Sequence, residues 1–208
     1  MTARTTGLVA ILRGLTPQEA PEIGRRLYAA GFRALEVPLN SPDPLASIRS
    51  LRDLLPADCA VGAGTVLTVE EVRAVHAAGA DLVVSPAMDA EVIAATVGLG
   101  MASCPGVVTP TEAFGALRAG ARTLKLFPAD AVGTAGLRAW RAVLPDDVAV
   151  LPVGGVDVDN LGEWASAGAA GAGIGSWLYR PGVDAQTLST RADALVGAWR
   201  TATRHRPR

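Results

Sequence analysis

The sequence predicts an α/β fold, a closed parallel (β/α)8 TIM barrel that forms a single domain over residues 1–208. Three observations support this prediction. Eight short β-like runs alternate with segments of helical period, capping motifs mark helix starts, and glycines mark helix ends. The β-α unit recurs about every 25 residues, as expected for a chain that closes a parallel sheet on itself.

The predicted strands are short apolar runs bounded by glycine, proline or polar residues. In chain order they cover residues 8–12, 33–39, 60–64, 81–86, 101–106, 123–128, 148–155 and 171–176. An open doubly wound sheet also alternates strands with helices. We discount it because no GxGxxG turn follows the first run, and an eighth unit exceeds what such sheets usually need.

Helix starts are predicted at capping boxes, where a threonine at the N-cap is followed three residues later by glutamate. The pairs are Thr16 with Glu19, Thr68 with Glu71, and Thr109 with Glu112. Helix ends are predicted at glycines that follow an alanine-rich turn and precede a strand. These glycines are Gly31, Gly79, Gly120 and Gly168.

Composition excludes several classes of protein. Half of the 208 residues are hydrophobic and 19% are charged, which predicts a compact globule rather than a disordered chain. Net charge is -1, and the arginines are scattered apart from a short basic tail at about 203–208, which argues against nucleic acid as a partner. No apolar run approaches the length of a membrane span or a signal-peptide core.

Cysteine and histidine usage argues for a metal-free cytoplasmic protein. Cys59 and Cys104 lie in apolar runs without CxxC spacing, so we interpret them as buried thiols in a reducing compartment. No cluster of His, Asp or Glu has the spacing of a metal site. We therefore expect the cytoplasm as the location, and neither a metal nor a cofactor.

One lysine stands out. Of nineteen basic side chains only Lys125 is lysine, at the centre of the run at 123–128. Strand alternation places Leu124 and Leu126 toward the helices, so Lys125 should face the barrel interior, as should Glu36 in its own run. A buried structural ion pair is the alternative, but arginine would bond a carboxylate better. Unlike arginine, lysine can lose its proton and attack a carbonyl.

Glycine turns follow the last two predicted strands, at Gly154 with Gly155 and at Gly175 with Ser176. They could be simple strand-to-helix turns. In barrels, however, the loops after strands seven and eight often bind phosphate through backbone N–H groups. Together with an inward lysine, they predict a phosphorylated carbonyl substrate.

Several motifs match a known family in order. The segments LVAILRG, EVPLNSP, GAGTVL, SPAMDAEVI, CPGVVTPTEAF, LKLFPAD, LPVGGV and GAGIGSWLYRPG, from about residue 8 to 182, closely resemble the 2-keto-3-deoxy-6-phosphosugar acid aldolases. The resemblance implies a class I, Schiff-base aldolase that releases pyruvate and D-glyceraldehyde 3-phosphate. It also implies a homotrimer that acts on a phosphorylated 2-keto-3-deoxy sugar acid.

The resemblance assigns roles by motif. It implies that Lys125 forms the Schiff base, that Glu36 moves protons, that Arg13 and Thr65 hold the carboxylate end, and that Phe127 packs on the pyruvyl group. It places the phosphate at Gly154, Gly155, Gly175 and Ser176.

Two further positions bear on the sugar acid. Gluconate-type relatives tend to read EVTLRT and PTGG, whereas this chain has Asn40 in EVPLNS and Val153 in PVGG, which favours a galactonate-type substrate. Asp130 in PAD and Trp177 after GIGS depart from the galactonate-type pattern, so the phosphate end should differ in shape.

Other functions remain open on the sequence. A gluconate-type or dual-specificity aldolase would use the same residues. A sugar-phosphate isomerase or epimerase would keep the barrel and use Glu36 as its base, without an imine. A phosphosugar-binding sensor would bind without turnover and would leave the lone Lys125 unexplained.

Overall fold

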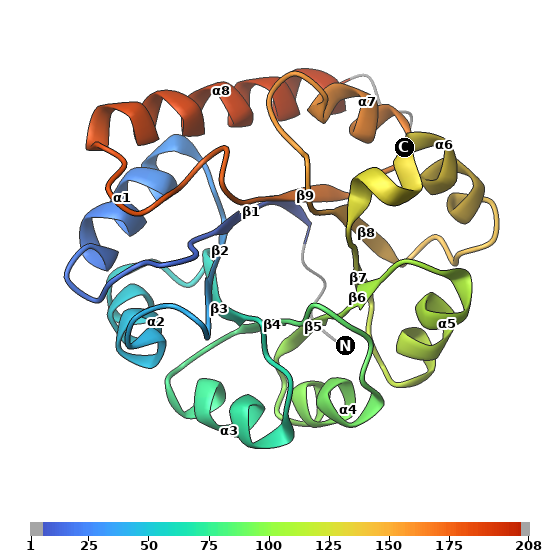
Figure 1. Ribbon diagram of the computed structural model, residues 1–208, viewed down its shortest axis with the longest axis horizontal. Helices are drawn as coiled ribbons and strands as arrows, with labels where there is room; N and C mark the ends of the chain where they lie inside the picture. The colour runs from blue at the N-terminus through green and yellow to red at the C-terminus, as the bar shows by residue number, and fades with distance from the viewer. Residues whose placement is uncertain (1–5, 205–208) are drawn as a thin grey trace.

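The computed structural model describes residues 6–204, which form an α/β fold with parallel strands in the middle and helices outside (Figure 1). Each predicted strand is present within this range. The strands are β1 Gly7–Ile11, β2 Ala34–Pro38, β3 Ala60–Gly64, β4 Leu82–Val84, β5 Ala102–Cys104, β6 Gly106–Val107, β7 Thr123–Leu126, β8 Ala149–Pro152 and β9 Gly171–Ile174.

Helices follow the strands and cover their outer side (Figure 1). They are α1 Ala20–Ala30, α2 Pro44–Leu54, α3 Val69–Ala77, α4 Ala90–Gly98, α5 Pro110–Arg118, α6 Ala129–Arg141, α7 Leu161–Ser166 and α8 Ala185–Thr203. The predicted basic tail at about 203–208 falls mostly outside the described residues, which end at 204.

The hydrogen bonds place the described strands in two parallel sheets, in the orders β5-β4-β3-β2-β1-β9 and β6-β7-β8. The fifth predicted strand changes partner at Pro105, which has no N–H to donate. Before it, β5 pairs with β4; after it, β6 pairs with β7. At the other junction a single bridge joins Val153 to Gly173. The prediction is thus confirmed for a parallel α/β ring with outer helices, whereas one continuous closed sheet is not observed.

The capping predictions are confirmed at two helices and wrong at a third. In α3 and α5, Thr68 and Thr109 accept from the N3 backbone N–H, and the N3 glutamate bonds back to the cap. Thr16 is not an N-cap, because α1 begins at Ala20. Thr16 and Glu19 still bond reciprocally, within a turn that precedes the helix. The reciprocal hydrogen bonds of a capping box are therefore present here, although the residues directly after Thr16 are not helical.

The glycines predicted to end helices all have positive φ, with values of 114°, 87°, 111° and 105° at Gly31, Gly79, Gly120 and Gly168. This is the left-handed conformation that glycine adopts at low cost. The helix ends are therefore placed as predicted.

The core has two parts. A large cluster fills the space between strands and helices and includes Leu124 and Leu126, both fully buried. A smaller cluster of mostly aliphatic side chains fills the inside of the ring: Val9, Ala34, Leu82, Val84, Ala102, Cys104 and Leu151. Since β7 alternates, Lys125 lies on the inner side, as predicted. None of the helices within residues 6–204 combines the length and hydropathy that a membrane span requires.

Candidate active site

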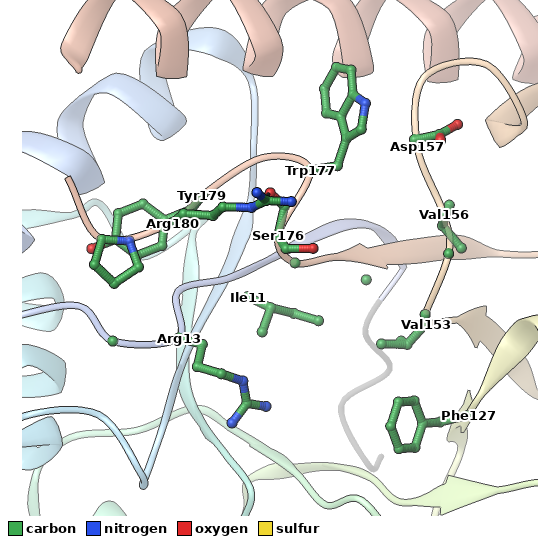
Figure 2. Close-up of a pocket in the computed structure, with 16 residues that line it drawn as sticks. Ile11, Arg13, Phe127, Val153, Val156, Asp157, Ser176, Trp177, Tyr179 and Arg180 are labelled. Carbon is green, nitrogen blue, oxygen red and sulfur yellow. Dashed lines mark hydrogen bonds between the residues drawn. The ribbon is translucent and has the colours of Figure 1, made fainter. Parts of the chain in front are cut away.

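A cavity of about 710 Å³ opens at the carboxyl ends of the strands (Figure 2). It brings together seven of the residues selected from the sequence, namely Arg13, Phe127, Val153, Gly154, Gly155, Gly175 and Ser176. Beneath it lies an apolar hollow of about 10 Å³, enough for roughly one water molecule, lined by Lys125 and Glu36. Ile11, Val153 and Gly173 line both spaces, so the two are adjacent.

Lys125 is held on β7, between β6 and β8. Its N–H donates to the carbonyl of Pro105 at 2.9 Å, and its Nζ lies 4.3 Å from the centre of the Phe127 ring. Only 8% of the residue is exposed, and this burial lowers the lysine pKa, against the opposing influence of Glu36. A larger fraction of Lys125 is therefore neutral, and hence nucleophilic, than of a lysine in water.

Glu36 lies on β2, where it is 2% exposed. Burial raises its pKa to about 7, although the positive charges of Lys125 and Arg13 lower it. Its Oε2 finds no hydrogen-bond partner among the described residues. A carboxyl with a pKa near neutrality can both accept and return a proton at physiological pH.

The alternative of a structural ion pair is not supported. The ion pairs formed within residues 6–204 do not include Lys125 with Glu36. Buried carboxyl and amine groups that lack this contact do not compensate their desolvation. Perturbed titration beside a cavity is instead typical of catalytic groups.

Gly64 makes room for the glutamate, which reasoning from the sequence missed. A Cβ placed on Gly64 would overlap Oε2 of Glu36 and lie 2.5 Å from its Cδ. No larger residue fits here while Glu36 keeps its position. The two residues lie on paired strands, two positions apart in register, so neither strand's own pattern could show the contact.

Cys104 is the other titratable group in the hollow. Burial raises the pKa of its thiol to about 12. The predicted burial of both cysteines is confirmed. A protonated thiol is a much weaker nucleophile than a thiolate. Lys125 is therefore the better nucleophile of the two residues in the hollow.

Arg13 extends from the end of β1 into the cavity (Figure 2). Its Nη1 donates to Oδ1 of Asn40 at 2.6 Å, which links the predicted carboxylate ligand to a predicted specificity residue. Asn40 itself does not line the cavity. It can act on a bound molecule through the orientation of Arg13.

Thr65 lies outside both spaces, so the structure does not bring it to the other predicted carboxylate ligand. Its backbone is left-handed, with φ of 58°, directly after Gly64 at the end of β3. This conformation is strained for a β-branched residue, and strain of this kind gathers at functional sites.

The two glycine turns lie at one end of the cavity. Gly154 and Gly155 have positive φ, at 98° and 69°. The side chain of Asn160 supports them, since its Nδ2 donates to the carbonyl of Gly155 at 2.7 Å and its Oδ1 accepts from the N–H of Asp157 at 3.2 Å. The turn is therefore preorganised, as an anion site built from backbone N–H groups requires.

Three further residues line this end and were not selected from the sequence: Tyr179, Arg180 and Pro181. Trp177, noted from the sequence, also lines the cavity, and the guanidinium carbon of Arg191 lies 6.0 Å from the centre of its ring. No group of His, Cys, Asp and Glu within the described part of the chain could hold a metal ion.

Comparisons with known proteins agree with one another. The family model described as KDPG and KHG aldolase matches residues 1–192. The chain is 49% identical to 2-dehydro-3-deoxy-6-phosphogalactonate aldolase of Escherichia coli (strain K12), over 94% of this chain and 95% of that one. It is also similar to a native KDPGal structure, with a TM-score of 0.94, 48% identity and coverage of 97% and 98%.

Two more solved structures are informative. A cage designed by fusing symmetric oligomeric domains has a TM-score of 0.93 and 48% identity, over 96% of this chain and 74% of that one. KDPG aldolase from Legionella pneumophila, with pyruvate captured as a covalent carbinolamine intermediate, has a TM-score of 0.79 and 27% identity, over 95% and 94%. On these matches, the chain belongs to the KDPG and KHG aldolase family and is a carbon-carbon lyase.

Proposed function

We propose that this enzyme is a class I aldolase that cleaves 2-dehydro-3-deoxy-6-phosphogalactonate to pyruvate and D-glyceraldehyde 3-phosphate. The observation that carries the proposal is a single lysine, Lys125, that shares a buried hollow with a carboxyl of raised pKa, Glu36, next to a cavity of about 710 Å³. The pyruvate carbinolamine of the Legionella relative supports covalent chemistry at this place in the fold.

The reaction begins when neutral Lys125 attacks C2 of the substrate ketone. Glu36 gives a proton to the carbinolamine hydroxyl, which leaves as water, and the resulting protonated imine accepts the electron pair of the C3–C4 bond. Glu36 removes the proton of the C4 hydroxyl, directly or through one water, as that bond breaks and the aldehyde leaves. The enamine then takes a proton at C3, and water hydrolyses the resulting imine to pyruvate and free Lys125.

The substrate lies across the cavity in this proposal. Arg13 and Thr65 hold its carboxylate, Phe127 packs on the pyruvyl part, and the turns at Gly154, Gly155, Gly175 and Ser176 hold its phosphate. Thr65 is not among the residues that line the cavity, so its hydroxyl would meet the carboxylate only if the loop after β3 moves toward the bound substrate. Val153, which lines both cavity and hollow, and Asn40, through Arg13, select the galactonate-type epimer.

The two sheets form one closed (β/α)8 barrel in our proposal, and residues 1–208 form one domain. The bridge from Val153 to Gly173 and the bond from the Lys125 N–H to the Pro105 carbonyl support closure, since they join strands on either side of the two breaks. We further propose a homotrimer, which the cage of symmetric oligomeric domains supports, and a cytoplasmic location, which the two free buried thiols support.

Reductive trapping tests the mechanism. Borohydride added with pyruvate should reduce the imine to a secondary amine, inactivate the enzyme and label one peptide that contains Lys125. Lys125→Arg should abolish the label and lower kcat by several orders of magnitude, because a guanidinium stays protonated. Arg73→Gln, at a surface arginine, is a control that should label like the wild type.

Two outcomes would contradict the proposal. A label found only on the N-terminal amine, or full cleavage by Lys125→Arg, would exclude the imine on this lysine. An isomerase or a sensor would show no pyruvate-dependent label at all. A coupled assay for pyruvate with both C4 epimers, in the presence of EDTA, should show cleavage without metal and a preference for the galactonate type.

A further inference from the structure

Arg180 reaches the phosphate end of the cavity from the segment after β9. Figure 2 shows its side chain running toward Ser176, with the guanidinium ending beside that residue. The contact is a hydrogen bond, since Nε donates to the backbone carbonyl of Ser176 at 2.9 Å. Among the described residues neither Nη has a partner, so the outer edge of the guanidinium is available to a ligand.

The backbone that carries Arg180 is firmly anchored. Tyr179 is buried, and its N–H donates to the carbonyl of Gly175 at 3.0 Å. The carbonyl of Arg180 accepts from the N–H of Val183 at 3.0 Å. Pro181 packs against Gly14, where a Cβ would lie 2.7 Å from its ring. When Arg180 binds a ligand, the backbone is already ordered, so the loss of conformational entropy is limited to the arginine side chain.

A phosphate bound at this end of the cavity would need a positively charged partner. The turns offer backbone N–H groups and the hydroxyl of Ser176, none of which carries a positive charge, and two acidic residues lie beside them. Asp157 lines the cavity, and the Cβ of Asp130 lies 3.9 Å from where a Cβ on Gly155 would be. The other cavity cation, Arg13, is bonded to Asn40. Of these two cations Arg180 is the one bonded to Ser176, so it is placed to supply the positive charge that a dianionic phosphate at the turns requires.

We propose that Arg180 binds the phosphate group of the substrate and makes the enzyme selective for phosphorylated over unphosphorylated 2-keto-3-deoxy sugar acids. This inference rests on the proposed function. The carbonyl of Ser176 holds Nε, and the Nη groups donate to phosphate oxygens while the turns donate from the other side. Guanidinium and phosphate match in geometry, so the contact adds direction as well as charge.

The test compares kcat/KM for the phosphorylated acid and its unphosphorylated analogue in Arg180→Gln. Loss of a charge-assisted bond should lower the ratio of the two values about 10- to 100-fold. Inorganic phosphate should inhibit the wild type competitively, with a Ki that rises about tenfold or more in Arg180→Gln. Arg73→Gln, which removes the same charge from an exposed site, should leave both measurements as in the wild type.

The outcomes separate this inference from the proposed function. If the wild type cleaves the phosphorylated acid and Arg180→Gln keeps the wild-type ratio, the inference is wrong. An equal loss on both substrates would assign Arg180 a structural role and would also overturn it. Arg180→Lys should bind inorganic phosphate more tightly than Arg180→Gln; equal Ki values would mean that charge here plays no part. A wild type that forms no pyruvate from the phosphorylated acid would instead refute the proposed function.

Discussion

Replacing Gly64 by alanine should disable the enzyme by moving Glu36. A Cβ on Gly64 would lie 2.5 Å from Cδ and 2.7 Å from Oε1 of Glu36. Carbon atoms in contact prefer about 3.5 Å, so the carboxyl must retreat by about 1 Å. A displacement of about 1 Å at a reacting group can cost about a hundredfold in rate, or about 2.7 kcal/mol of transition-state stabilisation. The backbone of Gly64 is not left-handed, so the effect is steric rather than conformational.

The assay measures kcat for pyruvate release together with exchange of the pyruvate methyl protons in deuterated water, which reports proton transfer at C3. Both should fall about a hundredfold in Gly64→Ala. Gly98→Ala is the matched control, because a Cβ there meets nothing within 4 Å and the residue lies in α4. Rates for Gly64→Ala within about threefold of the wild type, in a protein that melts normally, would refute the steric argument.

Three further changes test individual side chains. Because burial raises the pKa of Glu36 to about 7, kcat/KM should rise with pH and reach a plateau above that value. Glu36→Gln should abolish this rise of kcat/KM with pH. Between its unfolded pKa of about 4.3 and its folded pKa of about 7, the folded state alone keeps the proton, so the free energy of unfolding falls as pH rises. Glu36→Gln should remove this loss, which amounts to about 4 kcal/mol at the upper end of the window, as measured by urea titrations. Val153→Thr should shift the ratio of kcat/KM values toward the gluconate-type epimer about tenfold, whereas an unchanged ratio would mean that position 153 does not distinguish the epimers. Thr65→Gly should relieve a left-handed φ of 58° and raise stability by about 1 kcal/mol, while KM for pyruvate rises; an unchanged KM would exclude carboxylate binding by this hydroxyl.

The sequence predicted best those features that depend on local periodicity. Alternation along one strand was enough to place Lys125 inward and Leu124 outward, because the side-chain period of a strand is two residues. The boxes at Thr68 and Thr109 start helices because the residues after them are free to continue the helix. At Thr16 the same spacing closed a turn first, so the helix start was predicted three residues early.

Features that depend on neighbours in space were missed. The change of sheet partner at Pro105 requires knowing which strand lies on either side. Gly64 is explained by a glutamate on the adjacent strand, and Arg180 lines the cavity through a turn in which its Nε donates to the carbonyl of Ser176. Conversely, Thr65 was selected by motif alone, and its side chain lies outside the cavity lining.

The position of the lone lysine also offers a way to follow how the sheets open. A lysine-specific protease has one cleavage site in this chain, after Lys125, and would give two fragments, 1–125 and 126–208. That site lies in β7, hydrogen-bonded on both edges and 8% exposed, so the protease cannot bind it until the strand leaves the sheets. The rate of this single cut therefore measures the population of molecules in which β7 has left the sheets. A ligand that forms an imine with Lys125 would protect the chain in two ways, by stabilising the fold and by masking the residue that the protease recognises.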